Sequence, residues 1–183
     1  MFNIKIKLKI PARVLSALSP DMLAHNAVAD ATQAVARLVR DNFRRLDKER
    51  TVHGSHFYEE KGVNSTRSEV RGNRGVIIID SYEMAHKYYG GKVRPVRTKF
   101  LAIPAAEPFF VRTPRQFGRG KDSPLRFRKT RKGGLLYDVR NPSQVAYWLV
   151  REVVHKARKE TLPAKKEIER VAKRAVADYL KTI

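Results

Sequence analysis

The sequence predicts an α+β fold, in which a small antiparallel sheet packs against a long N-terminal helix and is accompanied by a C-terminal helical pair and a long basic loop. Three observations indicate this class. Apolar residues alternate with lysines near the N-terminus, they recur at helical spacing in long stretches, and residues 112–134 combine many cations with no periodicity. A chain of 183 residues can form one domain with a real core and is short for two. We therefore expect one domain over residues 1–183, with a basic arm at about 112–134.

The first ten residues predict a β-strand with one apolar and one cationic face. The alternating residues are Phe2, Ile4, Ile6, Leu8 and Ile10 on one face, and Asn3, Lys5, Lys7 and Lys9 on the other. Because successive side chains of a strand point to opposite faces, the lysines are expected in solvent. Pro11 ends the strand, and lysines at a sheet edge discourage edge-to-edge aggregation.

A long helix is predicted from Ser19-Pro20-Asp21 to about Lys48. These three residues supply an N-cap, a proline at the first helical position and an early acid. The apolar stripe of this helix recurs at steps of three and four residues and comprises Val28, Ala31, Val35, Leu38, Val39, Phe43 and Leu46. Residues 49–64 lack such spacing and are interpreted as a loop.

A β-hairpin is predicted next, with strands at residues 67–71 and 76–80 joined by the glycine-containing segment 72–75. Its second strand begins Val-Ile-Ile-Ile and is expected to be central. Gly90 and Gly91 permit backbone angles that are closed to other residues. The chain is therefore expected to turn there, and residues 92–103 to leave as an extended segment.

Residues 112–134 are interpreted as the basic arm. Its nine cations stand against Asp122, for a local charge of +8, and are Arg112, Arg115, Arg119, Lys121, Arg126, Arg128, Lys129, Arg131 and Lys132. Like charges repel and the segment has little apolar material to bury, so the arm is expected to be mobile in an isolated subunit.

The C-terminal part predicts a helical pair. Residues 135–139 are expected to return to the sheet, after which Asn141-Pro-Ser143 would cap a helix. Its apolar stripe would include Val145, Trp148, Leu149 and Val153, with Trp148 as a core anchor. Leu162-Pro163 would end this helix. A last helix is predicted through Ile168, Val171, Ala172, Ala175, Tyr179 and Leu180.

The charge of the chain predicts an acidic partner. The sequence has 39 Lys and Arg against 18 Asp and Glu, a formal net charge of +21. Nucleic acid, an acidic protein surface and an anionic membrane all fit this charge. The absence of cysteine excludes disulfides and thiolate metal sites. No apolar run is long enough to cross a bilayer and no signal-peptide pattern is present, so a soluble intracellular product without a membrane partner is expected.

The residues that could carry chemistry do not form a recognisable catalytic or metal motif. His53 and His56 are three apart, but Gly54-Ser55 between them disfavours a helix and no third ligand is close in sequence. The possible nucleophiles Ser55, Ser65 and Ser81 lie outside any Gly-x-Ser-x-Gly turn. The adjacent carboxylates Glu59-Glu60 fit a solvated charge cluster, and segment 72–75 is too short for a phosphate-binding loop. We expect no enzyme activity, no cofactor and no metal.

The basic arm is the one segment where a binding function competes with a solvated loop. Its cations, with Phe117 and Phe127 among them, could bind phosphates and stack on bases. The arm could equally dock on an acidic neighbouring subunit. No DNA-reading helix, zinc finger or RNA-binding strand motif frames it, which favours non-specific over sequence-specific contact.

Residues 86–104, HKYYGGKVRPVRTKFLAIP, resemble a stretch of the virion-morphogenesis proteins of tailed phages and prophages, the family of tail-completion, neck and head-tail joining proteins. There, too, a His, an aromatic residue, paired glycines and a late Leu-Ala-Ile-Pro occur in this order. The likeness extends to the run at residues 40–46 before the Phe-Tyr of residues 57–58, and to residues 147–151 followed by Leu162-Pro163. The basic segment 112–134 and the Tyr88-Tyr89 pair depart from the family pattern.

This resemblance implies a structural virion protein that forms a ring in the neck or at the head-proximal end of the tail and joins tail to head. It implies a homo-oligomeric ring, expected to be a hexamer, with other neck, connector, tail-tube or terminator proteins and packaged DNA as neighbours. Its location would be the virion, and the host cytoplasm during assembly. The alternative is a non-specific nucleic-acid-binding protein that uses the basic arm.

Overall fold

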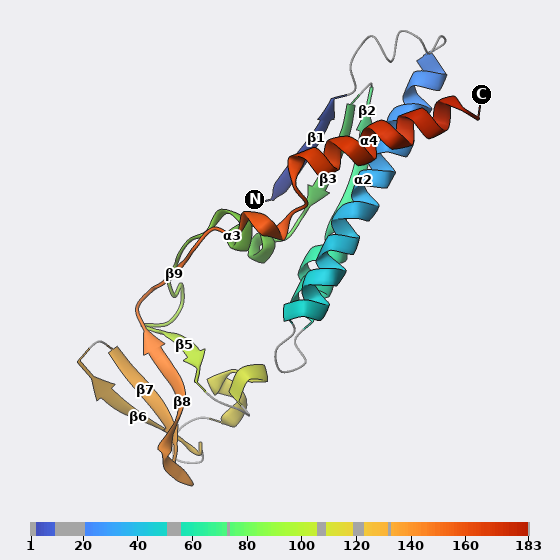
Figure 1. Cartoon of the computed structure of the whole chain (residues 1–183). Helices are drawn as coiled ribbons and strands as arrows, with labels where there is room; N and C mark the ends of the chain where they lie inside the picture. Colours follow the sequence, from blue (N-terminus) through green and yellow to red (C-terminus); the bar gives the residue numbers. More distant parts are fainter. Residues whose placement is uncertain are drawn as a thin grey trace. The chain divides into compact units, whose positions relative to one another are not determined.

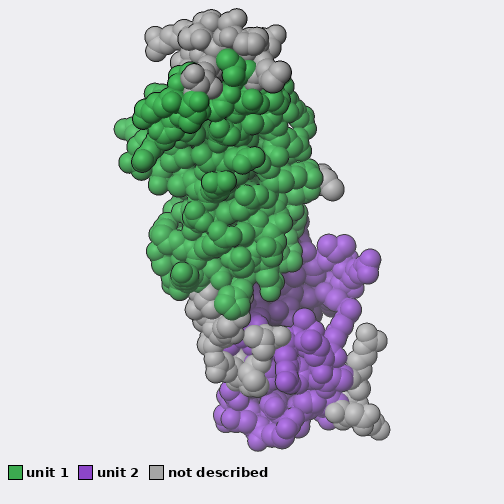
Figure 2. Space-filling model, turned by 90° about the vertical axis from the view of Figure 1, so that its right-hand side faces the viewer, with its two compact units in different colours: residues 1–90, 156–183 green, residues 91–155 purple. Residues whose placement is uncertain are grey.

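The structure, a computed structural model, describes residues 3–9, 21–50, 56–72, 74–105, 109–118, 123–131 and 133–182. It confirms the α+β class, with a long N-terminal helix, small antiparallel sheets and a C-terminal helix (Figure 1). Contacts within the chain divide it into two compact units, unit 1 over residues 1–90 and 156–183 and unit 2 over residues 91–155 (Figure 2). A single domain over the whole chain stays a prediction, and each unit is described by itself.

Unit 1 contains a three-stranded antiparallel sheet in the order β1-β3-β2. Its strands are β1 (Ile4–Lys9), β2 (Thr66–Arg71) and β3 (Arg74–Ile79). Ile77 of β3 lies opposite both Ile6 and Ser68, so these three residues share the inner face of the sheet. The predicted N-terminal strand, the hairpin and the central position of its second strand are all confirmed.

The long helix α2 (Asp21–Arg50) packs its apolar stripe against β2 and β3. Six of the predicted stripe residues are buried in the described core, namely Val28, Ala31, Val35, Val39, Phe43 and Leu46. The predicted N-cap at Ser19 and Pro20 lies outside the described residues. Close approach of α2 to β3 depends on Gly75, because a β-carbon there would overlap the hydroxyl of the buried Thr32.

The helix α4 (Lys165–Leu180) packs against α2 and confirms the last predicted helix (Figure 1). Val176 is its buried residue, and it packs with Val28 and Ala31 of α2. The other member of the predicted helical pair is wrong, since residues 141–150 and 153–155 are strands.

Three short elements of the described unit 1 go beyond the prediction, one of them the 3-10 turn η5 (Lys159–Thr161). The helix α3 (Tyr82–Tyr89) begins at Ser81, whose Oγ accepts a hydrogen bond from the amide of Met84 at 3.2 Å, and it ends at Gly90. A π-helical turn, η1 (Glu59–Val63), occupies part of the predicted loop at 49–64. Gly90 and Gly91 have φ angles of 73° and 135°, which are strained for other residues, so the chain direction changes there.

Unit 2 is built on a four-stranded antiparallel sheet in the order β5-β8-β7-β6. The strands are β5 (Leu101–Pro104), β6 (Leu125–Thr130), β7 (Gly133–Asp138) and β8 (Asn141–Val150). The short strands β4 (Gly91–Val93) and β9 (Val153–His155) pair with each other. Two 3-10 turns, η2 (Phe109–Val111) and η3 (Pro114–Phe117), lie between β5 and β6.

The segment after Asn141-Pro-Ser143, predicted as a helix, is a strand. The prediction failed because the apolar spacing of this segment fits a helix and a strand equally well. Val145 and Leu149 are a helical turn apart, and a spacing of four residues also fits the alternation of a strand. In the structure a bulge between Val145 and Tyr147 interrupts this alternation. The β-branched and aromatic residues of this segment favour the strand. The extended segment expected at 92–103 is interrupted, because only β4 and the start of β5 lie within it.

The predicted basic loop at 112–134 is also corrected. Residues 112–134 contain η3, the whole of β6 and the start of β7. Residues 112 and 113 come just before η3. Leu125 is buried, and β6 pairs with β7 from Leu125 opposite Asp138 to Thr130 opposite Gly133. Backbone pairing and a buried anchor hold these residues despite their charge. This pairing disfavours mobility of β6, and the mobility of the arm in an isolated subunit stays a prediction. Residues 135–139 do return to a sheet, but to the sheet of unit 2.

Gly75→Ala should lower the free energy of unfolding by about 1–3 kcal/mol, because the added methyl group overlaps Thr32 and forces α2 away from β3. Chemical denaturation measures this decrease. Adding Thr32→Ala should restore part of the stability, since the second change removes the clashing hydroxyl; Thr32→Ala alone is the control. A Gly75→Ala variant as stable as the parent protein would contradict this account of the packing of α2 on β3.

Candidate functional site

The residues that the sequence offered as nucleophiles or acids stabilise local structure, where the structure describes them. The Oγ of Ser65 donates a hydrogen bond to the carbonyl of Lys61 at 2.6 Å, and Ser81 is the N-cap of α3. Glu59 lies 3.9 Å from Arg44 in an exposed ion pair. His53 and Ser55 lie outside the described residues. Across the described ranges, no group of three His, Asp or Glu residues is arranged to hold a metal ion.

His56 forms a structural pair with Asp47 near the end of α2. Its Nδ1 lies 2.9 Å from Oδ2 of Asp47, whose Oδ1 accepts hydrogen bonds from the amides of Tyr58 and Glu59. Burial alone would raise the pKa of the Asp47 carboxyl, but the hydrogen bonds from His56 and the two amides outweigh burial and lower this pKa below its usual value. The carboxylate thus anchors the chain where it re-enters the core.

One face of the unit 2 sheet is covered by the 3-10 turns. Phe109 of η2 and Phe117 of η3 pack in T-shaped contacts with Tyr147 of β8, with ring centroids 5.5 Å and 6.4 Å from the centroid of the tyrosine ring. The hydroxyl of Tyr147 donates a hydrogen bond to the carbonyl of Arg112 at 2.8 Å. Burial raises the pKa of Tyr147, with the charge of Arg112 opposing this shift. Aromatic packing and this hydrogen bond hold the turns on the sheet.

The opposite face carries an apolar row that is partly exposed, in which Leu135 is buried and Trp148 and Ile103 are exposed. Leu135 of β7 lies opposite Trp148 of β8, and Trp148 lies opposite Ile103 of β5. Directly opposed residues of an antiparallel sheet share a face, so these three form a row across it. The side chains of Trp148 and Ile103 are 47% and 36% exposed. We call this row, with its neighbours Arg126, Arg128 and Tyr137, the uncovered sheet face.

Cations border this apolar row. Arg128 lies opposite Leu135, and its guanidinium is 4.8 Å from the ring centroid of Tyr137. Arg126 lies opposite Tyr137, and its guanidinium donates to the carbonyl of Ser123. An arginine over an aromatic ring is a stable cation–π arrangement whose outer side can still meet an acidic group or a base. The uncovered sheet face is therefore apolar at its centre and cationic at the β6 side.

The nine cations predicted to form one arm are distributed over several elements. Arg112 precedes η3 and Arg115 lies in it, Arg126, Arg128 and Lys129 lie in β6, and Arg131 lies in the turn before β7. Arg119, Lys121 and Lys132 lie outside the described residues. Unit 2 as a whole has 15 Lys and Arg against 4 Asp and Glu, a formal net charge of +11. The charge concentration predicted from the sequence thus belongs to a folded sheet as well as to its loops.

Two aromatic residues of the arm have different roles. Phe117 packs on the covered face with Phe109. Phe127 is exposed and its ring lies over Gly134, where any β-carbon would overlap it.

Trp148, predicted as a core anchor, is instead the most exposed residue of the apolar row on the uncovered sheet face. Trp148 is exposed because β8 is a strand that turns this residue to the uncovered sheet face. The β-branched residues near Trp148 were the sequence signal that could have indicated a strand.

Comparison of the chain with protein-family models, with curated protein sequences and with solved structures gives no match. Among the helices of the described ranges, none is both long and apolar enough to cross a bilayer. The features that bear on function are therefore the uncovered sheet face, the charge of the chain and the motifs in its sequence.

The free energy of unfolding should fall as the pH drops below about 4, because the folded state lowers the pKa of Asp47 relative to an ordinary carboxyl. A lowered folded pKa contributes stability that is present above the unfolded pKa and is lost as the pH falls through the folded pKa. Asp47→Asn should cost about 1–2 kcal/mol near pH 7 and flatten this acid dependence. Denaturation at several pH values measures both effects. Asp41→Asn, at an exposed carboxylate of the same helix, is the control, and equal acid dependence of the two variants would contradict the assignment.

Proposed function

We propose that this chain is a non-catalytic structural protein of a tailed-phage or prophage virion, which forms a ring in the neck or at the head-proximal end of the tail and joins tail to head. The resemblance of residues 86–104 to virion-morphogenesis proteins supports this role. The structural observation that carries the proposal is the uncovered sheet face, where Trp148 and Ile103 are exposed and Arg128 lies on the other side of Leu135 in the same row. Contact with another protein would remove these apolar side chains from water.

The energetic reason is the cost of leaving apolar side chains in water. Burial of the exposed part of a tryptophan contributes on the order of 2 kcal/mol. Tryptophan and arginine are also the residue types that most often dominate the energy of protein interfaces. A row with Trp148 at its centre and Arg128 beside it has the composition of an interface core with a charged border.

A ring also suits the asymmetry of the subunit. Ring closure requires heterologous contacts, in which one surface of a subunit meets a different surface of the next. The uncovered sheet face of unit 2, with Trp148 at its centre, and the charged surface of α2 around Asp41, Arg44 and Arg45 are such unlike surfaces. The hexamer, the neck or tail position and the virion and host-cytoplasm locations are parts of the same proposal.

The charge limits which neighbours such a ring can have. Subunits with a formal charge of +21 repel one another unless acidic groups lie close by. Acidic neck, connector, tail-tube or terminator proteins would supply these groups, and packaged DNA could do so along the inner wall. Complementary charge would also speed assembly and exclude wrong partners.

The double variant Trp148→Asp with Ile103→Asp should fold but fail to enter particles, because it places two carboxylates in the apolar centre of the interface. Infectious yield should fall by about tenfold or more. Val96→Asp is the matched control, since Val96 belongs to the same unit and is 97% exposed. Circular dichroism checks folding, and electron microscopy should show unjoined heads and tails. Normal joined virions with the double variant, or without the protein, would contradict the proposal.

The second candidate function is non-specific nucleic-acid binding. The specific observation that favours it is the pairing of Arg128 with Tyr137, on the same sheet face as the exposed Trp148 and in a unit with a formal charge of +11. Single-stranded nucleic acids bind such combinations of aromatic platforms and cations, and their phosphates make binding depend on salt. We favour protein docking, since the resemblance implies assembly and DNA in a virion channel must still slide.

Charge reversal separates the two candidates. The full variant replaces by Glu the five cations Arg126, Arg128, Lys129, Arg131 and Lys132, and a matched variant keeps Arg126, which bonds to backbone carbonyls. If these residues meet DNA, the salt slope of DNA binding should fall by about 0.9 for each phosphate that the variant no longer neutralises. If they dock on acidic protein, the slope should stay nearly unchanged while incorporation into particles falls. Normal infectious yield without DNA binding would show that nucleic acid is the partner.

A further inference from the structure

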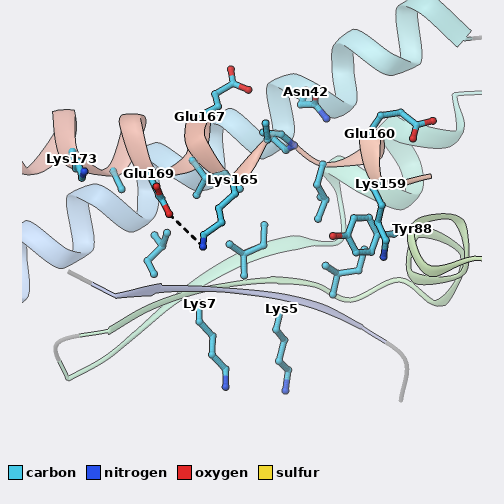
Figure 3. Close-up of a pocket in the computed structure, with 18 of the residues that line it drawn as sticks. Lys5, Lys7, Asn42, Tyr88, Lys159, Glu160, Lys165, Glu167, Glu169 and Lys173 are labelled. Carbon is cyan, nitrogen blue, oxygen red and sulfur yellow. Dashed lines mark ion pairs between the residues drawn. The ribbon is translucent and has the colours of Figure 1, made fainter. Parts of the chain in front are cut away.

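Unit 1 contains a groove of about 1390 Å³ between β1 and α4 (Figure 3). One wall is the inner face of β1, with Ile4, Ile6 and Leu8, and the other wall is a stripe of α4. The apolar residues of that stripe are Ile168, Ala172, Val176, Ala177 and Leu180. Tyr88, Tyr89 and Lys159 lie at one end, where the ammonium of Lys159 is 4.0 Å from the ring centroid of Tyr88. The groove is therefore apolar inside and has an aromatic, cationic end.

The strand that forms one wall is also an edge strand. β1 pairs with β3 on one side, and no strand of the described residues pairs with its other side. The backbone of an edge strand offers unpaired N–H and C=O groups at every second residue, which can accept another strand. A strand added there would lie in the plane of the sheet and point alternate side chains into the groove, on the same side as Ile4, Ile6 and Leu8.

The charges around the groove select the occupant. The side chains of Lys5 and Lys7 point away from the groove to the outer face of the sheet, while Lys165 and Lys173 lie at the α4 side (Figure 3). Lys165 is paired with Glu169 at 3.8 Å. The charged residues around the groove are the six cations Lys5, Lys7, Arg45, Lys159, Lys165 and Lys173 and the three acids Glu160, Glu167 and Glu169, and most of the excess of cations comes from Lys5 and Lys7 at the outer face of the sheet. An incoming strand would meet lysines on both sides.

We propose that this groove binds an extended acidic segment of a partner protein, which adds to the sheet as a fourth strand beside β1. Its apolar side chains fill the groove, and its alternate carboxylates lie beside Lys5 and Lys7 on the outer face. The backbone of β1 supplies affinity, and the alternation of apolar and acidic residues supplies specificity. This inference concerns a surface separate from the uncovered sheet face and does not depend on ring formation.

A second copy of this chain is a poor occupant. Pairing of β1 with the β1 of another copy would place two rows of lysines side by side on the same face, which is destabilising. Nucleic acid is also disfavoured, because phosphates do not match walls made of Ile4, Ile6, Ile168 and Leu180. An acidic amphipathic strand satisfies both the apolar walls and the charged border.

The test uses the full chain and three synthetic fluorescent peptides of about nine residues, the length of a typical strand. In the first, Glu alternates with Val or Ile. The second has the same composition with its acids clustered at one end, and the third has Lys in place of Glu. Fluorescence anisotropy at moderate salt measures binding, and amide hydrogen exchange measures protection of residues 4–9. We expect only the first peptide to bind and to protect β1.

Two variants that change the charge of the chain by the same amount test where the peptide binds. Lys5→Glu with Lys7→Glu should weaken binding of the first peptide by about tenfold or more, because like charges would then face its carboxylates. Lys166→Glu with Arg170→Glu changes the charge equally on α4, at exposed residues that do not line the groove, and should leave binding within about twofold. Both variants are at exposed positions, and their thermal unfolding checks that they fold.

Several results would overturn the inference. Equal binding of the alternating and clustered acidic peptides would mean general charge attraction instead of strand addition. Equal binding of the lysine peptide, or no binding by any of the three, would exclude an acidic strand. Protection of residues 4–9 that rises with protein concentration alone would show that a second copy fills the groove.

Discussion

The half-covered sheet of unit 2 is the constraint on which the functional account depends. The two aromatic 3-10 turns cover one face, fixed by Tyr147 and its hydrogen bond to Arg112, and the described chain provides nothing comparable for the other. The strand β8 therefore has a buried side around Tyr147 and an exposed side around Trp148. Such a sheet is stable enough to fold, yet it leaves apolar area that association can remove from water.

Unit 1 differs because it completes its own core. α2 covers the inner face of its sheet, and α4 adds a second layer with Val176 against Val28 and Ala31. What it leaves open is the outer edge of β1 and the groove beside it. Both open surfaces of the molecule combine an apolar centre with a cationic border. This shared chemistry explains why a chain with a formal charge of +21 would need acidic neighbours to assemble.

The sequence predicted the elements whose periodicity is unambiguous. The alternation in β1, the stripe of α2 and the spacing of α4 each fit one period only, and the structure contains all three. The apolar residues of β8 fit both periods, so the sequence alone predicts a helix there, whereas pairing with β5 and β7 makes the segment a strand. The strand β6 could not be predicted from the many cations of the arm, because cations on an exposed face do not indicate whether the backbone pairs with another strand. Trp148 could not be recognised as a surface residue until β8 was known to be a strand, whereas the basic residues beside it could be found from the sequence alone.

The most direct test of the central claim is to identify what lies against position 148 in an assembled particle. The photoreactive residue p-benzoylphenylalanine can replace Trp148, and brief illumination of purified particles then joins it covalently to its nearest neighbour. We expect a cross-link to protein, either another copy of this chain or an acidic virion protein, and no cross-link in the dispersed subunit. A cross-link to DNA, or incorporation into particles with no cross-link at all, would contradict the assignment of the uncovered sheet face as an assembly interface.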